Sequence, residues 1–214
     1  MRGRPAIRLA VMMCIALIGC GGERDAFERS QRDIDRGWAY YSVGDMSSAL
    51  MSFERATSVD LPPGDAYNGL GWVYLSSSEE VGGNDQLISQ AVGAFQRAVR
   101  IDMENSDAWV GLALSLFLRR SDEDDLKSAI EAIDQAMKNE KLLYRHDYTS
   151  KADLWALRGL CNFYLQKVDL ALEDLRKALR IDPRNETALR LLYLIDRTKR
   201  ELRLKRLFGV PGRR

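Results

Sequence analysis

The chain has 214 residues, of which 46% are hydrophobic and 29% are charged, and its formal net charge is +1. This composition is typical of a globular protein with one or two domains. The balance of 32 basic and 31 acidic residues disfavours a nucleic-acid-binding protein, which usually carries a clear excess of positive charge. One His and three Cys leave little material for a metal site or a disulfide framework.

The first nineteen residues have the pattern of a secretory signal peptide. Arg2, Arg4 and Arg8 precede an apolar run over residues 9–18, which is shorter than the about 20 residues of a membrane-spanning helix. The following Leu17-Ile18-Gly19-Cys20 resembles the bacterial lipobox. The resemblance implies a signal peptide at 1–19, lipidation at Cys20 and a polar linker at 20–29. An ordinary cleaved signal with an incidental Cys20 is the alternative.

The residue after the lipobox bears on the location of the protein. The same resemblance implies that an Asp after the acylated Cys would retain the protein in the inner membrane, and this chain has Gly21 there. We therefore expect a lipid anchor in the cell envelope, on the periplasmic face of the outer membrane.

A pattern of small and apolar residues recurs along the rest of the chain. Ala49, Phe53 and Ala56 are spaced by four and three, which places them on one face of a helix. Three further trios have the same spacing: Ala91, Phe95 and Ala98; Ala129, Ile133 and Ala136; Ala171, Leu175 and Ala178. A stretch with Gly or Ala beside large apolar residues precedes each trio, which predicts pairs of closely packed helices.

This pattern resembles the tetratricopeptide repeat, W-x₂-L-G-x₂-Y…A-x₃-F…P in a unit of 34 residues. The resemblance implies an all-α fold, a right-handed α-α superhelix (solenoid) of about four helix pairs closed by a C-terminal capping helix. The units are placed at 30–63, 64–105, 106–143 and 152–185, followed by the capping helix at 186–208 and a basic tail at 209–214. The face of the capping helix that covers the last repeat is expected to hold Ala188, Leu189, Leu192 and Ile195.

Several features depart from the repeat pattern. Insertions at 76–84, 119–125 and 139–150 are expected to form polar loops between helices. Arg36 and Arg158 stand where the pattern has Leu, and Asn162 stands where it has Tyr.

The resemblance also implies a binding groove, because such repeats hold a peptide or a partner helix on the inner face of the first helix in each unit. The predicted groove residues are Trp38, Tyr41, Asn68, Trp72, Leu114, Phe117, Phe163 and Tyr164. Trp38 and Trp72 occupy equivalent places, so they are expected to lie side by side as anchors for a partner. The alternative is that they pack between neighbouring helices.

The resemblance to the tetratricopeptide repeat also indicates which kind of partner segment the groove would bind. Relatives that clamp a C-terminal carboxylate use Lys and Asn donors on this face. The corresponding residues here are Ile34, Asn68, Val110 and Ala156, so only Asn68 offers a donor. A protein or peptide partner with an apolar or aromatic segment is therefore favoured over a carboxylate-terminated peptide.

No catalytic motif, metal site, cofactor site or small-molecule substrate site is predicted from the sequence. Phosphate-binding loops, Cys-x-x-Cys, His-Glu-x-x-His and Gly-x-Ser-x-Gly are all missing. A metal-assisted hydrolase around the acidic run 122–125 and His146 is one alternative. The other interpretation is a capped helix next to a solvated loop. Cys161 is expected to be a packing residue.

The charge is unevenly distributed, since residues 184–214 hold ten basic and three acidic residues. A membrane-surface adaptor that works through this basic tail is a further alternative, beside a solvated helix. The function expected is a non-catalytic, lipid-anchored scaffold or adaptor in the bacterial envelope. Envelope lipoproteins with this repeat include pilus secretin pilotins and subunits of the barrel-insertion complex, which suggests a role in assembling an outer-membrane, pilus or secretion complex.

Overall fold

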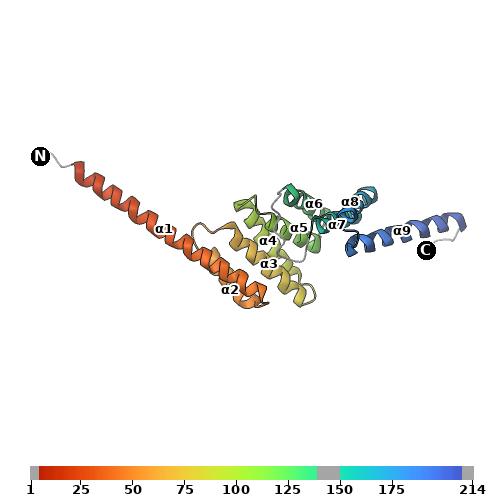
Figure 1. Ribbon diagram of the computed structural model, residues 1–214, viewed down its shortest axis with the longest axis horizontal. Helices are drawn as coiled ribbons and strands as arrows, with labels where there is room; N and C mark the ends of the chain where they lie inside the picture. The colour runs from red at the N-terminus through yellow and green to blue at the C-terminus, as the bar shows by residue number, and fades with distance from the viewer. Residues whose placement is uncertain (1–4, 139–149, 209–214) are drawn as a thin grey trace. The chain divides into compact units, whose positions relative to one another are not determined.

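The protein is all-α in the part of the chain that its computed structural model describes. The backbone is described for residues 5–138 and 150–208, and the side chains for 24–138 and 150–201. The helices are α1 (Pro5–Ser42), α2 (Met46–Thr57), α3 (Gly64–Glu80), α4 (Asp85–Ile101), α5 (Ser106–Arg119), α6 (Glu123–Lys138), α7 (Lys151–Tyr164), α8 (Val168–Ile181) and α9 (Glu186–Phe208) (Figure 1). The predicted fold class, helix pairs followed by a C-terminal helix, is confirmed.

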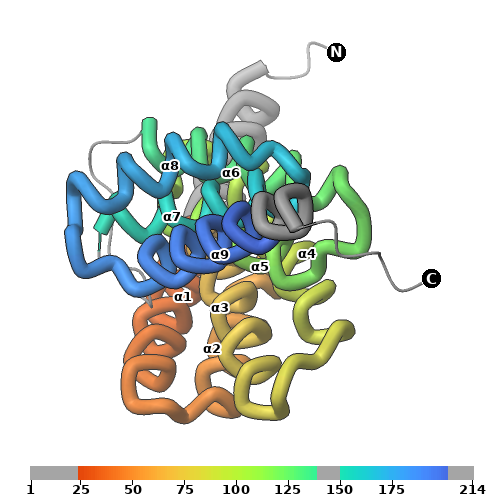
Figure 2. The backbone as a smooth tube through the Cα atoms, turned by 90° about the vertical axis from the view of Figure 1, so that its right-hand side faces the viewer, coloured from red at the N-terminus to blue at the C-terminus, as the bar shows by residue number. Residues whose placement is uncertain are grey.

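The chain divides into two compact units, residues 1–108 and 109–214, which are described separately below. The predicted repeat 64–105 contains α3 and α4, and the predicted repeat 152–185 contains α8 and all of α7 except its first residue. The repeat predicted at 30–63 contains α2 and the last part of α1. Figure 2 shows α1, α2 and α3 side by side in the first unit.

The predictions for the N-terminal segment are mostly untested by the structure. The side chains of the predicted signal peptide and of Cys20 lie outside the described residues, as do His146 and the predicted basic tail 209–214. The backbone of the predicted linker, residues 20–29, is helical and belongs to α1. Among the described residues, no helix combines the length and the apolar character needed to span a membrane.

Local sequence signals explain where several helices begin. The side chain of Asp45 accepts a hydrogen bond from the backbone N–H of Ser48 at the start of α2, and Asn84 caps α4 in the same way. Ser150 and Asp153 form a capping box at the start of α7. Such caps satisfy N–H groups that have no partner within the helix. The turn before α2 is tight because Gly44 adopts a φ of 79°, which Gly allows at low cost.

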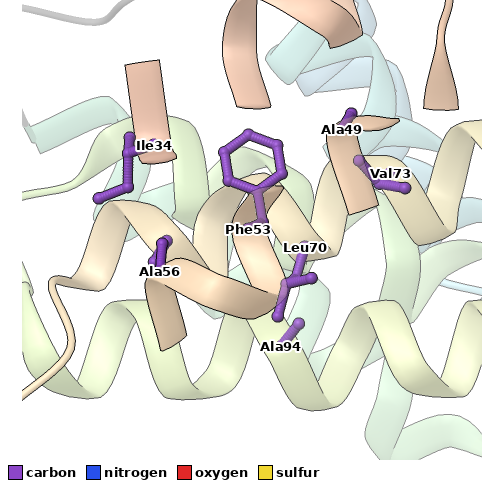
Figure 3. Close-up of a cluster of buried hydrophobic side chains, with 8 residues drawn as sticks. Ile34, Ala49, Phe53, Ala56, Leu70, Val73 and Ala94 are labelled. Atoms are coloured by element: carbon purple, nitrogen blue, oxygen red, sulfur yellow. The ribbon is translucent and has the colours of Figure 1, made fainter. Parts of the chain in front are cut away.

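The core of the first unit is built around the ring of Phe53, which is fully buried on α2 (Figure 3). The ring lies between two glycines on different helices: a Cβ atom added to Gly37 of α1 would come within 2.6 Å of it, and one added to Gly69 of α3 within 2.2 Å. Phe95 of α4 packs against Gly71 of α3 in the same manner, because a Cβ atom added to Gly71 would lie 2.6 Å from the Phe95 ring. The glycines therefore allow the close approach of helices that the sequence pattern predicts.

The insertions only partly form the loops that were expected. Residues 76–80 continue α3 to Glu80, so the first insertion mainly lengthens a helix, and only residues 81–84 form the turn to α4. The second insertion is shortened from both sides, because α5 ends at Arg119 and α6 begins at Glu123. Most of the third insertion lies outside the described residues.

In the second unit, α9 covers an apolar core formed with α7 and α8, as a capping helix should. Ala188, Leu191 and Ile195 are buried there with Leu175 and Ala178, and Leu192 is partly buried. The predicted face was wrong in one residue: Leu189 is 46% exposed, and Leu191 takes its place. Leu191 lies three residues after Ala188 and so on the same helix face as Leu192 and Ile195, whereas Leu189 is turned by about 100° from Ala188.

Arg158 and Asn162, which depart from the repeat pattern, both contact Asp174 on α8. Asp174 is buried, and it accepts a hydrogen bond from Asn162 Nδ2 at 2.8 Å. Arg158 Nε lies 3.6 Å from the same carboxylate and Arg158 Nη1 lies 3.1 Å from Asp134 of α6. Three positions that are apolar in the repeat at 64–105, namely Leu70, Tyr74 and Ala94, are thus replaced here by a polar cluster of Arg158, Asn162 and Asp174.

Candidate functional site

The predicted groove residues of the first unit form one aromatic group and one buried polar network. Trp38 is half-buried and packs edge-on against Tyr41, with ring centroids 5.7 Å apart, and against Phe53, at 5.1 Å. The Tyr41 hydroxyl shares a hydrogen bond of 2.7 Å with Ser76 Oγ. Both residues therefore keep part of their surface accessible while contacts from two other helices fix their orientation.

A network of hydrogen bonds links the two tryptophans to the helices that follow them. Trp38 Nε1 donates to Asp65 Oδ2 at 2.9 Å, and Trp72 Nε1 donates to Asp107 Oδ2 at 3.1 Å. Asn68 Nδ2 joins the two carboxylates, at 3.0 Å from Asp65 Oδ1 and 2.9 Å from Asp107 Oδ2. The equivalence of Trp38 and Trp72 is thus confirmed, because each bonds an Asp at the second position of the next α3- or α5-type helix.

Two of the predicted groove residues are buried and have a structural role. Trp72 is 1% exposed and packs edge-on against Phe95, at 5.4 Å, so it cannot anchor a partner in this conformation. Asn68 is fully buried, and its amide N–H donors already bond two carboxylates. For these two residues the structure corrects the predicted binding role in favour of packing. Asn68 was the one predicted donor for a C-terminal carboxylate, and its amide is already used within the fold.

In the second unit, three predicted groove residues come together at the ends of α5 and α7. Phe117 and Tyr164 have ring centroids 5.8 Å apart, and Phe163 and Tyr164 have centroids 6.0 Å apart, in edge-to-face arrangements. Tyr164 is 50% exposed, whereas Phe117, Phe163 and the predicted Leu114 are half-buried. Aromatic residues in such half-exposed positions are common anchors in protein interfaces.

An arginine that the sequence analysis did not single out completes this group. The Arg120 guanidinium lies 5.2 Å from the ring centroid of Phe117 and 5.4 Å from that of Tyr164. We call Phe117, Phe163, Tyr164 and Arg120 the aromatic cluster. The repeat pattern has no position for Arg120, which follows the last residue of α5, so spacing gave no signal for it.

The acidic residues 122–125 after α5 cap the start of α6 and pair with Arg119 at the end of α5. Asp122 Oδ1 accepts hydrogen bonds from the backbone N–H groups of Asp124 and Asp125, at 2.9 and 3.0 Å. Asp125 binds the Arg119 guanidinium through both carboxylate oxygens and accepts a bond from Ser121. The Arg119 guanidinium lowers the pKa of Asp125 to about 2. These contacts support the capping interpretation, with α6 beginning at Glu123.

The other candidate groups give no sign of a reactive site among the described residues. Cys161 is buried, and burial raises its pKa to about 12, which keeps the sulfur in the weakly nucleophilic thiol form. The described residues contain no group of three His, Cys, Asp or Glu side chains that could hold a metal ion.

Comparison with known proteins identifies the repeat. The tetratricopeptide-repeat family model matches residues 152–185, the range that holds α8 and all of α7 except its first residue. Residues 152–185 are a tetratricopeptide repeat. No curated protein sequence matches it.

Several solved structures, among them YrrB, pilF and MamA, share the fold of this chain. YrrB, described as a tetratricopeptide-repeat protein with an unusual peptide-binding site, is 22% identical, with 73% of this chain and 71% of that chain covered and a TM-score of 0.58. For pilF of Pseudomonas aeruginosa the identity is 20%, the coverage 90% and 79%, and the TM-score 0.58. For MamA the identity is 19%, the coverage 87% and 99%, and the TM-score 0.58. At these identities the likeness shows the fold alone.

Proposed function

We propose that this tetratricopeptide-repeat protein is a non-catalytic adaptor that binds an apolar or aromatic segment of a partner protein. The observation that carries the proposal is the aromatic cluster, in which residues from two helices converge and leave Tyr164 half-exposed. Trp38 and Tyr41 offer a second, partly accessible aromatic surface in the first unit. The peptide-binding site described for YrrB supports the same use of the fold.

We further propose that the adaptor is tethered to the cell envelope through a lipid on Cys20. The support is the lipobox-like Leu17-Ile18-Gly19-Cys20, together with Gly21 in the position that sorts such proteins to the outer membrane. Two or three acyl chains bind a bilayer firmly, because each buried CH₂ group contributes about 0.8 kcal/mol. Confinement to one surface raises the effective concentration of a partner on that surface, which suits a protein that helps assemble an outer-membrane, pilus or secretion complex.

The test of the adaptor is photo-crosslinking in intact cells. A photoreactive phenylalanine analogue at Tyr164 should capture a discrete partner, whereas the same group at Val81, an exposed residue in the turn between α3 and α4, serves as the control. Phe117→Ala should weaken the Tyr164 crosslink at an unchanged protein level. An identical set of crosslinks from both sites, insensitive to Phe117→Ala, would remove the aromatic cluster from the binding surface.

The anchor is tested separately. Cys20→Ser should release the protein from the membrane fraction or leave the signal peptide uncleaved. Membrane retention of processed Cys20→Ser protein would argue against the lipid anchor and would leave the adaptor proposal untouched.

Membrane contact through α9 is a second candidate, favoured by the exposed side of that helix. Tyr193 is 70% exposed beside exposed Leu189 and Leu194, and Arg190 and Arg197 lie on the same helix. Apolar and basic groups together are typical of helices that bind anionic lipid surfaces. Protein with Cys20→Ser should then bind anionic vesicles, and the combined change of Tyr193→Ser and Arg197→Gln should weaken the binding; unchanged binding would refute this role of α9.

A further inference from the structure

Two consecutive arginines at the end of α5 have different environments. Arg119 is paired with the carboxylate of Asp125, to which it donates through Nε at 2.9 Å and also through Nη2. Arg120 has no carboxylate within ion-pair distance among the described residues, although acidic side chains follow it at 122–125. Among the described residues, the charge of Arg119 is thus neutralised by a carboxylate and the charge of Arg120 is not.

The Arg120 guanidinium is nevertheless held in place. It lies over the rings of Phe117 and Tyr164, at 5.2 and 5.4 Å from their centroids, and its Nη1 donates to the backbone oxygen of Phe117 at 2.9 Å. A weaker contact joins Nη1 to the oxygen of Leu118 at 3.5 Å. The Nε and Nη2 groups make no hydrogen bond with the described residues. The rings and carbonyls therefore orient a guanidinium whose other N–H donors are not used by the described residues.

The backbone at Arg120 supports a role for the side chain. Arg120 has a φ of 22°, and it directly follows the last residue of a helix, where Gly is the usual choice. A residue with a Cβ atom is disfavoured at positive φ. The fold alone would therefore be served better by Gly, and strain of this kind is often found at functional positions.

We propose that Arg120, framed by Phe117 and Tyr164, recognises an Asp or Glu side chain that lies next to an aromatic or apolar residue in the partner segment. An arginine stacked on aromatic rings directs its N–H donors outward in one plane, which matches the geometry of a carboxylate. A cationic partner group is disfavoured, because the cluster already holds a positive charge. A C-terminal carboxylate is not the proposed source, because the positions that clamp one in relatives hold no available donor here.

This inference rests on the proposed adaptor function and specifies the chemistry of its partner. It is tested with two capped peptides, Ac-Phe-Glu-Leu-Phe-NH₂ and Ac-Phe-Gln-Leu-Phe-NH₂, which have no terminal carboxylate. Binding to the full chain carrying Cys20→Ser is measured by calorimetry or NMR titration. Since the guanidinium is solvent-exposed, we expect the Glu peptide to bind about fivefold more tightly than the Gln peptide.

Three variants make the test specific to Arg120. Arg120→Gly should abolish the preference for Glu while leaving the unfolding midpoint unchanged or higher, because Gly relieves the positive φ. Arg120→Lys should reduce the preference, since it keeps the charge and loses the planar donors. Arg97→Gln is the matched control, because Arg97 lies over the single ring of Tyr67 at 5.6 Å in the first unit, and it should retain the preference.

Equal affinity for the two peptides, no binding of either peptide, or a preference that survives Arg120→Gly would each overturn the inference. The crosslinking experiment at Tyr164 separates this failure from failure of the adaptor. A partner captured at Tyr164 without any preference for Glu would leave the adaptor standing and refute carboxylate recognition. A preference for Glu without a crosslinked partner in cells would refute the adaptor.

Discussion

Replacing Gly69 with alanine tests whether the close approach of helices around Phe53 determines the stability of the first unit. A Cβ atom at position 69 would lie 2.2 Å from Phe53 Cε1, 2.3 Å from Cζ and 2.5 Å from Cδ1. Normal carbon–carbon contacts are about 3.5–4.0 Å, so the ring would have to move by more than 1 Å. Gly37 bounds the other side of the ring, with a corresponding distance of 2.6 Å, and the ring is fully buried. It therefore has little room to move.

The magnitude follows from two opposing effects. Overpacking a core generally costs about 1–3 kcal/mol, and the enclosed ring places this site toward the upper end of that range. Alanine recovers up to about 1 kcal/mol of helix propensity relative to glycine. We therefore expect Gly69→Ala to lower the free energy of unfolding by about 2 kcal/mol.

Gly93 provides the matched control, since it lies inside α4 and a Cβ atom there would meet nothing within 4 Å. Gly93→Ala should raise stability by up to about 1 kcal/mol through helix propensity alone. Urea unfolding followed by far-ultraviolet circular dichroism measures both variants. In Gly69→Ala, a further Phe53→Leu change should restore part of the loss, because the smaller side chain makes room for the methyl group. If both alanine variants shift the midpoint in the same direction, or if Phe53→Leu simply adds its own cost, the packing argument is wrong.

Three further predictions concern other parts of the chain. Asp125→Asn should reduce the free energy of unfolding by about 2 kcal/mol near neutral pH. Because the pKa of Asp125 is lowered from 3.8 to about 2 in the folded protein, this loss should be complete above pH 3.8 and should shrink as the pH falls toward 2. Denaturation of both proteins at each pH measures it. The Cys161 thiol should resist alkylation by iodoacetamide under native conditions and react in urea; rapid labelling of the folded protein, detected by mass spectrometry, would contradict its burial. Ending the chain after Asn185 should uncover the core beneath α9 and increase binding of a hydrophobic dye; an unchanged dye signal would mean that α9 does not protect that core.

The sequence predicted the helical pairs well because their determinants are local. The spacing of Ala49, Phe53 and Ala56 fixes one face of a helix, and Gly69 and Gly71 mark where neighbouring helices approach most closely. Each of these residues acts through size alone. Their consequence for packing could therefore be inferred without coordinates.

The errors arose where a partner distant in sequence decides the outcome. The indole N–H of Trp72 can be buried because Asp107, which lies 35 residues away, accepts its hydrogen bond. The spacing of apolar residues in the sequence does not predict such a bond. The choice of Leu189 was an error of a different kind, because Leu191, Leu192 and Ile195 follow Ala188 at i+3, i+4 and i+7, and this spacing already favoured Leu191 over Leu189. Arg120 had no signal at all, since its role depends on rings from two helices and on a positive φ that the sequence does not reveal.

The polar cluster of Arg158, Asn162 and Asp174 has a consequence for how the repeats can be exchanged. A single substitution toward the apolar residues of the repeat at 64–105, such as Arg158→Leu, would leave the buried Asp174 carboxylate without its nearest positive charge. The reverse change, Ala94→Asp, would place a carboxylate against Leu70 and Tyr74. An unpaired buried charge is strongly destabilising, whereas replacement of a whole buried ionic group by apolar residues is often tolerated. These three positions are therefore energetically coupled, and any chimera or consensus design built from this chain must change all three together.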